Sequence, residues 1–288
     1  MTVYPLVLHL GPIEMTGYGV MLMVGFLVGG WTIQRQLRSR GLNEEAASDM
    51  VMWAVVGGIV GAKIWYVVLT QDPGALLSRS GLVWYGGFVG GAAAVFLNGL
   101  RQRIPARLAL DLAAPALAVG YALGRVGCFL VQDDYGVPTS LPWGMKFPEG
   151  LPPSTAQRMF TDFGVPIPDG VIPLEVLAVH PTQLYEVAAM MVAFWALWRL
   201  RNHARGTGWL FGVYLLFAGT ERFLVEFIRA KDDRFLAGFT MAQLASIIVT
   251  IVGAAFMARW ANRDKVIVPA DSGIRRTNAP GRRRTSSN

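Results

Sequence analysis

The sequence predicts an all-α polytopic membrane protein with about seven transmembrane helices and an extracytoplasmic head between spans four and five. Three observations lead to this prediction. Of the 288 residues, 53% are hydrophobic and only 16% are charged, which is too apolar for an ordinary soluble domain. Apolar stretches of membrane-spanning length recur along the chain. The basic residues gather in alternate connections between these stretches.

The apolar stretches have the length of about 20 residues that a helix needs to cross the hydrocarbon core. They cover residues 16–34, 48–70, 82–100, 108–131, 181–199, 207–229 and 237–260. The connections are short except for 132–180, which is rich in proline and glycine and is therefore expected to fold as the head. Residues 1–15 lack the basic start of a cleavable signal peptide, so we expect the first span to act as its own insertion signal.

The distribution of lysine and arginine predicts the orientation. Alternate connections on one side carry seventeen basic residues and those on the other side carry six. The positive-inside rule then places the N-terminus and the head outside and the C-terminus in the cytoplasm. The net charge of +7 has the same explanation, so it does not indicate binding to nucleic acid. We expect one membrane domain over 1–260, followed by a basic, disordered cytoplasmic tail over 261–288.

Glycines four residues apart predict close contacts between helices. The segments 57–61 and 86–91 contain three such pairs, namely Gly57 with Gly61, Gly86 with Gly90 and Gly87 with Gly91. Small residues at this spacing let helix backbones approach each other in lipid. A second interpretation stays open for Gly86 and Gly87, which could line a surface for a lipid headgroup.

Charged residues inside the spans indicate a functional site. Arg125 lies about seventeen residues into the fourth stretch, where an arginine costs about 2.5–3.5 kcal/mol on insertion scales. Arg222, Glu226 and Arg229 are spaced to share one helix face, and we expect Arg222 to pair with Glu226. A salt-bridge network that only locks the bundle would explain this segment equally well.

Other polar side chains are expected at the same depth. They are Tyr18 in the first span, Tyr85 in the third, and Gln183, Tyr185 and Glu186 at the start of the fifth. Since guanidinium groups bind phosphate bidentately, this convergence favours a phospholipid headgroup site. We expect Glu226 and a lipid phosphate to neutralise Arg125.

Several segments resemble the prolipoprotein diacylglyceryl transferases, a bacterial family of seven-span membrane enzymes. The most specific is "GRVGCFLVQDDYG" (124–136). The others are "LVWYGGFVGG" (82–91), "HPTQLYE" (180–186), "RFLVEFIR" (222–229) and "GFTMAQLASI" (238–247), in the order that the family shows. The resemblance extends over nearly all of residues 10 to 260.

The resemblance implies transfer of the diacylglyceryl group of phosphatidylglycerol to the thiol of a lipobox cysteine in a prolipoprotein signal peptide. It implies catalytic roles for Arg125, Arg222, Glu226 and Tyr85. The implied substrate-binding residues are Arg125, Tyr18, Gly86, Gly87, Cys128, Asp133, Gly136, Gln183, Tyr185, Glu186 and Arg229. It further implies the bacterial inner membrane and contact with membrane lipids, and it calls for no metal, no cofactor and no nucleic acid.

Three positions depart from the family pattern. Tyr85 stands where some members have histidine, and because tyrosine is a poor base at neutral pH we expect it to donate a hydrogen bond. His180 is another candidate base, or it only begins a helix. Asp133 and Asp134 occupy the acidic position, where either could accept the thiol proton or cap the span. Ala218 replaces a common tyrosine.

Cys128, the single cysteine, follows Arg125 by one turn and is interpreted as a small packing residue in preference to a covalent intermediate. Three other functions stay open. One is a divergent paralogue acting on another phospholipid or acceptor, and the second is a non-catalytic lipid-binding membrane protein. The third, a small-molecule transporter, is disfavoured because the charges gather near one interface and the two halves show no repeat.

Overall fold

The computed structural model describes residues 1–10, 13–77, 81, 83–166, 170–230, 234–236 and 238–275. Within them the chain forms eight α-helices, one short 3-10 helix and two small antiparallel hairpins. It divides into two compact units. Unit 1 comprises residues 1–29 and 113–265, and unit 2 comprises residues 30–112 and the chain from 266 onward. The prediction of one membrane domain over 1–260 stays a prediction.

Each of the seven predicted spans contains a helix. These are α1 (Gly17–Ser39), α2 (Ala46–Thr70), α3 (Trp84–Arg101), α4 (Ala106–Leu130), α6 (Thr182–Leu200), α7 (Trp209–Val225) and α8 (Met241–Trp260). Among the described residues, α1, α2, α4 and α8 are long and apolar enough to cross a membrane. The prediction of a helical, membrane-type fold is confirmed, whereas the number of seven spans stays a prediction.

The sixth predicted span ends earlier than expected. Helix α7 stops at Val225, so Arg229 lies beyond the helix and does not continue its face. The backbone leaves the helix because Arg229 forms an antiparallel bridge with Gly136, and the N–H of Val137 donates to the carbonyl of Ile228 at 2.9 Å. The prediction that Arg222, Glu226 and Arg229 share one helix face was therefore wrong for Arg229.

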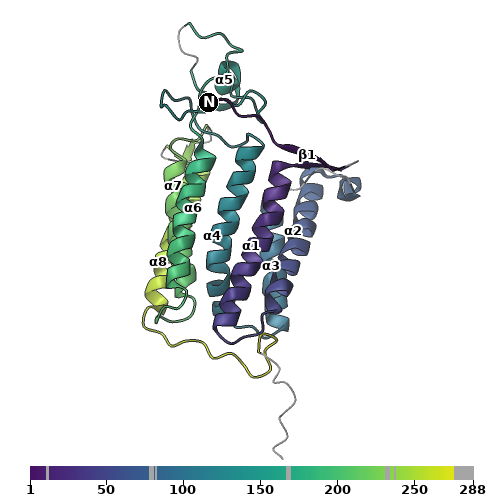
Figure 1. Ribbon diagram of the computed structural model, residues 1–288, viewed down its shortest axis with the longest axis vertical. Coiled ribbons are helices and arrows are strands. Elements are labelled where there is room, and N and C mark those ends of the chain that lie inside the picture. The colour runs from purple at the N-terminus through teal and green to yellow at the C-terminus, as the bar shows by residue number, and fades with distance from the viewer. Residues whose placement is uncertain are drawn as a thin grey trace, which may run out of the picture. The chain divides into compact units, whose positions relative to one another are not determined.

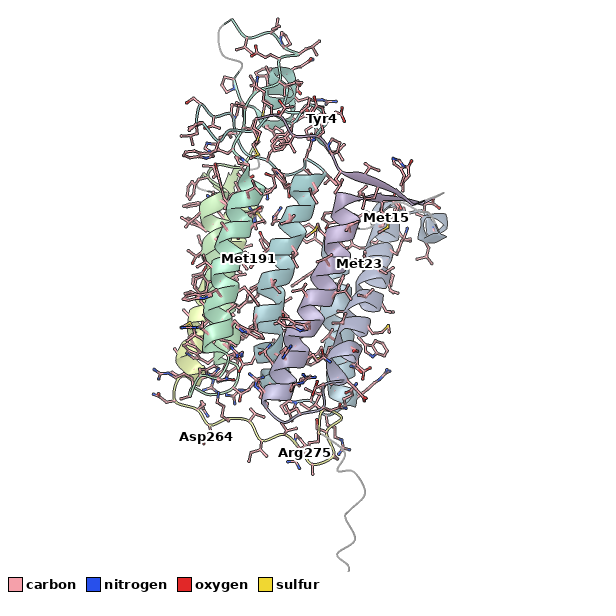
Figure 2. All side chains as sticks on the ribbon, viewed as in Figure 1. Tyr4, Met15, Met23, Met191, Asp264 and Arg275 are labelled. Atoms are coloured by element: carbon pink, nitrogen blue, oxygen red, sulfur yellow. The ribbon has the colours of Figure 1, made fainter. Side chains whose placement is uncertain are left out.

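In unit 1, helix α7 packs against both α6 and α8 (Figure 1). The core between α4, α6 and α7 consists of alanines and larger aliphatic side chains, namely Ala114, Ala118, Ala122, Met190, Ala193, Leu197, Leu210 and Val213. Apolar side chains such as Met23 and Met191 are exposed on α1 and α6 (Figure 2). Such exposure is expected where lipid replaces water as the solvent.

Residues 131–166 and 170–181 contribute to a second small core in unit 1. Helix α5 (Ala156–Phe163) is capped by Thr155, whose hydroxyl accepts the N–H of Arg158. The ring of Tyr135 stacks on Phe147 with 5.3 Å between centroids. The described residues of this segment are folded, and the extracytoplasmic head over 132–180 stays a prediction. Ahead of α1, strands β1 (Val7–Leu10) and β2 (Ile13–Thr16) form one hairpin.

In unit 2, helices α2 and α3 contact each other through glycines. A Cβ on Gly90 would clash with the carbonyl of Gly57 and lie 2.7 Å from the Cα of Gly61. A Cβ on Gly86 would clash with the carbonyl of Gly61. The predicted packing role of the glycine pairs is therefore confirmed for these four residues. The 3-10 helix η1 (Pro73–Leu77) follows α2.

The chain after α8 returns to unit 2. The N–H of Asn43 donates to the carbonyl of Ile274 at 2.7 Å, and the N–H of Gly273 donates to the carbonyl of Gln102 at 2.8 Å. Ile274 is fully buried. This part of the predicted tail thus contacts the connections that flank α2 and α3, and residues 276–288 lie outside the described residues.

Strands β3 (Arg234–Leu236) and β4 (Phe239–Thr240) precede α8.

Candidate functional site

Arg125 lies near the end of α4 and binds two carboxylates. Its Nη1 is 2.7 Å from Oδ2 of Asp134, and its Nε is 2.8 Å from Oε2 of Glu186. The hydroxyl of Tyr121 accepts from the same guanidinium at 3.3 Å and donates to Glu186 at 3.2 Å. Two acidic partners therefore offset the cost of burying Arg125. The expectation that Glu226 neutralises Arg125 was wrong, because Glu226 is bound elsewhere.

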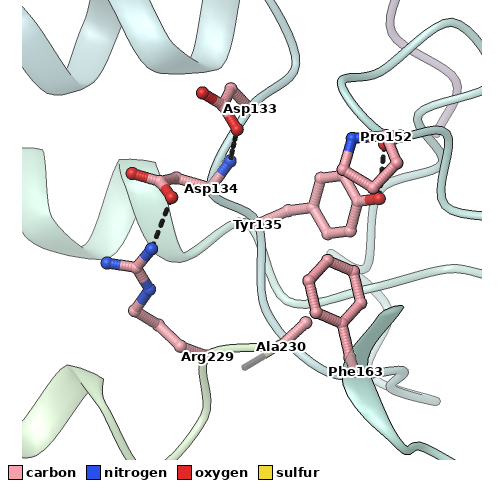
Figure 3. A pocket seen from close by; sticks show the side chains of 7 residues that line it. All are labelled: Asp133, Asp134, Tyr135, Pro152, Phe163, Arg229 and Ala230. Atoms are coloured by element: carbon pink, nitrogen blue, oxygen red, sulfur yellow. Dashed lines mark hydrogen bonds and ion pairs between the residues drawn. The ribbon is translucent and has the colours of Figure 1, made fainter. Parts of the chain in front are cut away.

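Asp134 joins Arg125 to Arg229. Helix α4 ends at Leu130, and Gln132 and Asp134 then adopt positive φ angles of 60° and 63°, a backbone conformation that aspartate tolerates better than most residues. The turn directs the Asp134 carboxylate toward the guanidinium of Arg229, with which it forms an ion pair (Figure 3). Burial alone would raise the pKa of Asp134, but Arg229 and Arg125 outweigh it and lower the pKa.

Asp133 has a different environment. Burial and the neighbouring Asp134 raise the pKa of its carboxyl above the ordinary value. Its Oδ1 accepts the N–H of Asp134 at 2.7 Å. Of the two carboxyls that the sequence offered as proton acceptors, Asp134 is held as a carboxylate between two arginines, whereas Asp133 is the more basic group.

Arg222 and Glu226 form the predicted pair at the end of α7. Nη2 of Arg222 is 2.7 Å from Oε2 of Glu226, whose side chain is fully buried. The hydroxyl of Thr240 donates to Oε1 of Glu226 at 3.0 Å. Thr240 also accepts the N–H of Gln243, so one threonine both caps α8 and fixes Glu226.

The start of α6 positions the turn that carries Asp134. The amide of Gln183 donates to the carbonyl of Asp133 at 2.6 Å, and the hydroxyl of Thr182 donates to the carbonyl of Asp134 at 2.8 Å. The N–H of Gly136 donates to the carbonyl of His180. A Cβ on Gly136 would lie 2.8 Å from Cγ2 of Thr182, so only glycine fits there without displacement. These contacts position the site, and the substrate contacts predicted for Gln183 and Gly136 stay predictions.

Of three further predicted residues in unit 1, Tyr18 and Cys128 lie near Arg125, whereas Tyr185 has other partners. Tyr18 on α1 is close enough to interact electrostatically with Arg125 and packs against Gly127. Sγ of Cys128 is 3.9 Å from Nη1 of Arg125. The hydroxyl of Tyr185 accepts the indole N–H of Trp143 at 2.7 Å, away from the ion pairs. Its other neighbour is Nδ1 of His180 at 3.3 Å, and burial lowers the pKa of that imidazole.

Tyr85, Gly86 and Gly87 belong to unit 2, on the first turn of α3. Tyr85 is largely exposed, whereas Gly86 is packed against the backbone of Gly61. The catalytic role predicted for Tyr85 and the substrate contacts predicted for Gly86 and Gly87 stay predictions.

Two features of the site were not predicted from the sequence. One is the bridging of two arginines by Asp134, because that contact depends on the turn after α4. The other is Glu221, which is 8% exposed on α7 and whose Oε1 has no hydrogen-bond partner among the described residues. The signal that drew attention to Arg125, a charge inside an apolar span, applies equally to Glu221.

The side chains of Arg125, Arg222 and Arg229 with their carboxylate partners form an arginine cluster, in which two buried donors have no acceptor among the described residues. Within the described part of the chain, Nη1 of Arg222 and Nε of Arg229 have no hydrogen-bond partner. Beside Arg229 lies a pocket of about 230 Å³ bordered by Asp133 and Asp134 and walled by Tyr135 and Phe163 (Figure 3). Buried guanidinium donors are costly unless an acceptor satisfies them, and an oxyanion is their best match. The arrangement is therefore suited to binding an anionic group such as a phosphate.

A bundle of apolar helices with buried arginine–carboxylate pairs beneath a small folded segment defines a membrane protein with a polar interior site. The profile of the prolipoprotein diacylglyceryl transferases matches residues 5–259. The chain is 33% identical over 270 residues to the phosphatidylglycerol–prolipoprotein diacylglyceryl transferase of Pseudomonas fluorescens, covering 86% of this chain and 90% of the relative. It is 32% identical over 278 residues to that of Cupriavidus metallidurans, covering 90% and 93%. For that of Clostridium tetani the identity is 29% over 257 residues, covering 86% and 94%. The chain belongs to the prolipoprotein diacylglyceryl transferase family, whose members are bacterial membrane enzymes.

Proposed function

We propose that this protein transfers the diacylglyceryl group of phosphatidylglycerol to the thiol of the lipobox cysteine of prolipoproteins, the first step of bacterial lipoprotein maturation. The observation that carries the proposal is the pair of buried, unsatisfied guanidinium donors on Arg222 and Arg229 next to the paired Arg125. The names of the relatives, which specify phosphatidylglycerol and prolipoprotein, agree with a site for a phosphodiester.

The reaction requires a displacement at the glycerol carbon that carries the phosphate. The thiolate sulfur of the acceptor forms a bond to this carbon, the carbon–oxygen bond breaks, and glycerol phosphate leaves with the bonding electrons. Negative charge develops on the leaving phosphate, so donors fixed beside it stabilise the transition state. Arg222 and Arg125 supply these donors, Glu226 orients Arg222, and Arg229 binds the phosphate at the edge of the cluster.

The proton of the thiol must be accepted before or during the attack. Asp133 fits this role better than Asp134, because burial raises the pKa of its carboxyl while Asp134 is ion-paired to two arginines. Tyr85 contributes a hydrogen bond to the substrate. The other substrate-binding residues are Tyr18, Gly86, Gly87, Cys128, Gly136, Gln183, Tyr185 and Glu186.

In this proposal seven helices cross the bacterial inner membrane. The N-terminus and the folded segment 132–180 lie outside, and the basic tail lies in the cytoplasm. The side assigned to the cytoplasm carries seventeen basic residues and the other side carries six, which supports this orientation. The arginine cluster adjoins the folded segment 132–180, where a secreted prolipoprotein and outer-leaflet lipid would both have access.

The test mixes the full-length purified protein with phosphatidylglycerol labelled in its diacylglyceryl group and with a lipobox peptide. We expect label transfer to the peptide, none to a peptide with serine in place of cysteine, and none by Arg222→Ala. Arg158→Ala is the matched control, since Arg158 is an exposed arginine in the same unit. Full activity of Arg222→Ala would contradict the assigned site. Lipid binding by the wild type without transfer to the peptide would indicate a paralogue that uses another acceptor.

A further inference from the structure

Glu221 is a buried acid that the proposed reaction does not use. It lies on α7, one residue before Arg222, and is 8% exposed. It follows Phe217 by one turn and so continues the face of α7 that packs in the core with α4 and α6. Its Oε1 is buried without a hydrogen-bond partner, and it forms no ion pair among the described residues. An ionised carboxylate in such a position is costly.

The groups close enough to interact electrostatically with Glu221 come from the elements packed around it. They are Tyr121 and Arg125 on α4, Glu186 on α6, Tyr214 and Arg222 on α7, and Arg229 after α7. The guanidinium groups among them are already paired. Arg125 binds Glu186 and Asp134, Arg222 binds Glu226, and Arg229 binds Asp134. Glu221 therefore has no guanidinium of its own.

The charges of this cluster do not balance when every group is ionised. Three guanidinium groups face four carboxylates, those of Asp134, Glu186, Glu221 and Glu226, and Asp133 adds to the negative side where it is ionised. A phosphodiester brings one more negative charge into the same low-dielectric interior. Repulsion between like charges is strong there, and the carboxylate with the fewest partners is the one that gains most from a proton.

We propose that Glu221 takes up one proton when the phosphodiester of the lipid binds, so that anion binding and protonation are coupled in this cluster. The inference rests on the proposed function, because it takes the arginine cluster as the phosphate site. A protonated Glu221 leaves three carboxylates opposite three guanidinium groups, and the lipid phosphate then meets a neutral cluster with unsatisfied donors on Arg222 and Arg229. Linkage requires the reverse effect as well, so raising the pH must weaken lipid binding.

The experiment titrates the full-length protein in neutral detergent with phosphatidylglycerol by calorimetry, between about pH 5.5 and 8.5. Each pH is measured in two buffers of different ionisation enthalpy, which counts the protons exchanged. The lipid phosphodiester keeps its single charge over this range. Where the free Glu221 is ionised, we expect uptake that approaches one proton per lipid and a Kd that rises up to about tenfold per pH unit. Where Glu221 is already protonated in the free protein, uptake and the slope of the Kd both fall to zero.

Glu221→Gln, which keeps the shape of the side chain and removes its charge, is expected to abolish proton uptake and the pH dependence. Its Kd at high pH should equal the wild-type value at low pH. Glu149→Gln, at an exposed acid in the same unit, is the matched control and should behave as the wild type. Thermal unfolding of each variant verifies folding, and the wild-type proton count stands even if Glu221→Gln unfolds.

The outcomes separate the two proposals. Absence of phosphatidylglycerol binding by the wild type at every pH would overturn the phosphate site and with it this inference. Binding without proton uptake would overturn only the coupling. Uptake that persists in Glu221→Gln and disappears in Glu186→Gln would assign the proton to Glu186 and overturn the role of Glu221.

Discussion

The arginine cluster of unit 1 and the glycine contacts of unit 2 are two opposite ways of joining helices in an apolar solvent. In unit 1, the side chains of Arg125, Arg222 and Arg229 are mostly buried and each is bound by a carboxylate. In unit 2, α2 and α3 meet through glycines such as Gly61 and Gly90, with backbone against backbone. The first contact depends on charge balance, and the second depends on the absence of a side chain.

The difference shows which region can host chemistry. Contacts between glycine backbones leave no room for a ligand, and small-residue packing is sufficient to join helices in lipid. Buried ion pairs are not needed for association, and they cost more to bury than small residues do. A cluster that retains buried donors without acceptors is therefore better explained by a ligand than by bundle stability.

The largest effect is expected for Arg125→Ala. The substitution leaves Glu186 and Asp134 without their shared guanidinium and removes a donor from the phosphate site. We expect diacylglyceryl transfer to fall by about 10²–10³-fold, as when a transition-state donor is removed. Transfer of labelled lipid to a lipobox peptide measures this. A rate within twofold of the wild type would show that the cluster only holds the helices together.

Substitution of Gly90 by alanine tests the glycine half of the comparison. The added Cβ would clash with Gly57 and Gly61, so α2 and α3 must separate, at a cost of about 1–3 kcal/mol. Gly99→Ala on the same helix is the matched control, since nothing lies within 4 Å of its Cβ position. Thermal unfolding in detergent should show a lower Tm for Gly90→Ala and an unchanged or higher Tm for Gly99→Ala. Equal Tm values would contradict the close contact.

The two regions also differ in how many of their contacts could be predicted from the sequence. Glycine spacing is local, so a close helix contact at Gly57, Gly61, Gly86 and Gly90 was predictable, whereas which pairs meet was not. The pair Arg222–Glu226 was predictable for the same reason, because the spacing of four residues fixes it within one helix.

The partners of Arg125 were not predictable, because they are set by tertiary structure. Asp134 reaches Arg125 and Arg229 only after the chain turns with positive φ at Gln132 and Asp134. The end of α7 at Val225 depends on the bridge between Gly136 and Arg229, which lie far apart in the sequence. The helical pattern of the sequence continues through Arg229, so it does not predict that α7 ends at Val225.

Thr240→Val should have an intermediate effect. It removes the hydroxyl that caps α8 and that donates to the buried Glu226. Loss of a cap costs about 0.5–2 kcal/mol, so we expect a lower Tm together with a few-fold slower transfer, as Arg222 loses a firmly held partner. Thr240→Ser retains both hydrogen bonds and is the control. A slower rate without any loss of stability would mean that Thr240 serves Glu226 alone.

The smallest effect is expected from the titration of Asp134. Arg229 and Arg125 lower the pKa of this carboxyl despite its burial, so the folded protein binds its proton less readily than the unfolded chain. The stabilisation is thus complete above the ordinary pKa of aspartate, about 4, and is lost as the pH falls toward the lower folded value. Asp134→Asn removes this component. The unfolding free energy of the wild type should therefore decrease more steeply between about pH 5 and 3 than that of Asp134→Asn.

Asp162→Asn is the matched control for this titration, because Asp162 pairs with the exposed Arg158 in the same unit. Exposed ion pairs contribute about 0–1 kcal/mol, so its pH profile should follow the wild type. Identical slopes for the wild type and Asp134→Asn would show that Asp134 gains as little from its arginines as a surface carboxylate does. In that case the charge balance of the cluster would have to come from Glu186 and Glu226 alone. The contrast between the ion pairs of unit 1 and the glycine contacts of unit 2 would then have no support from the stability contributed by Asp134.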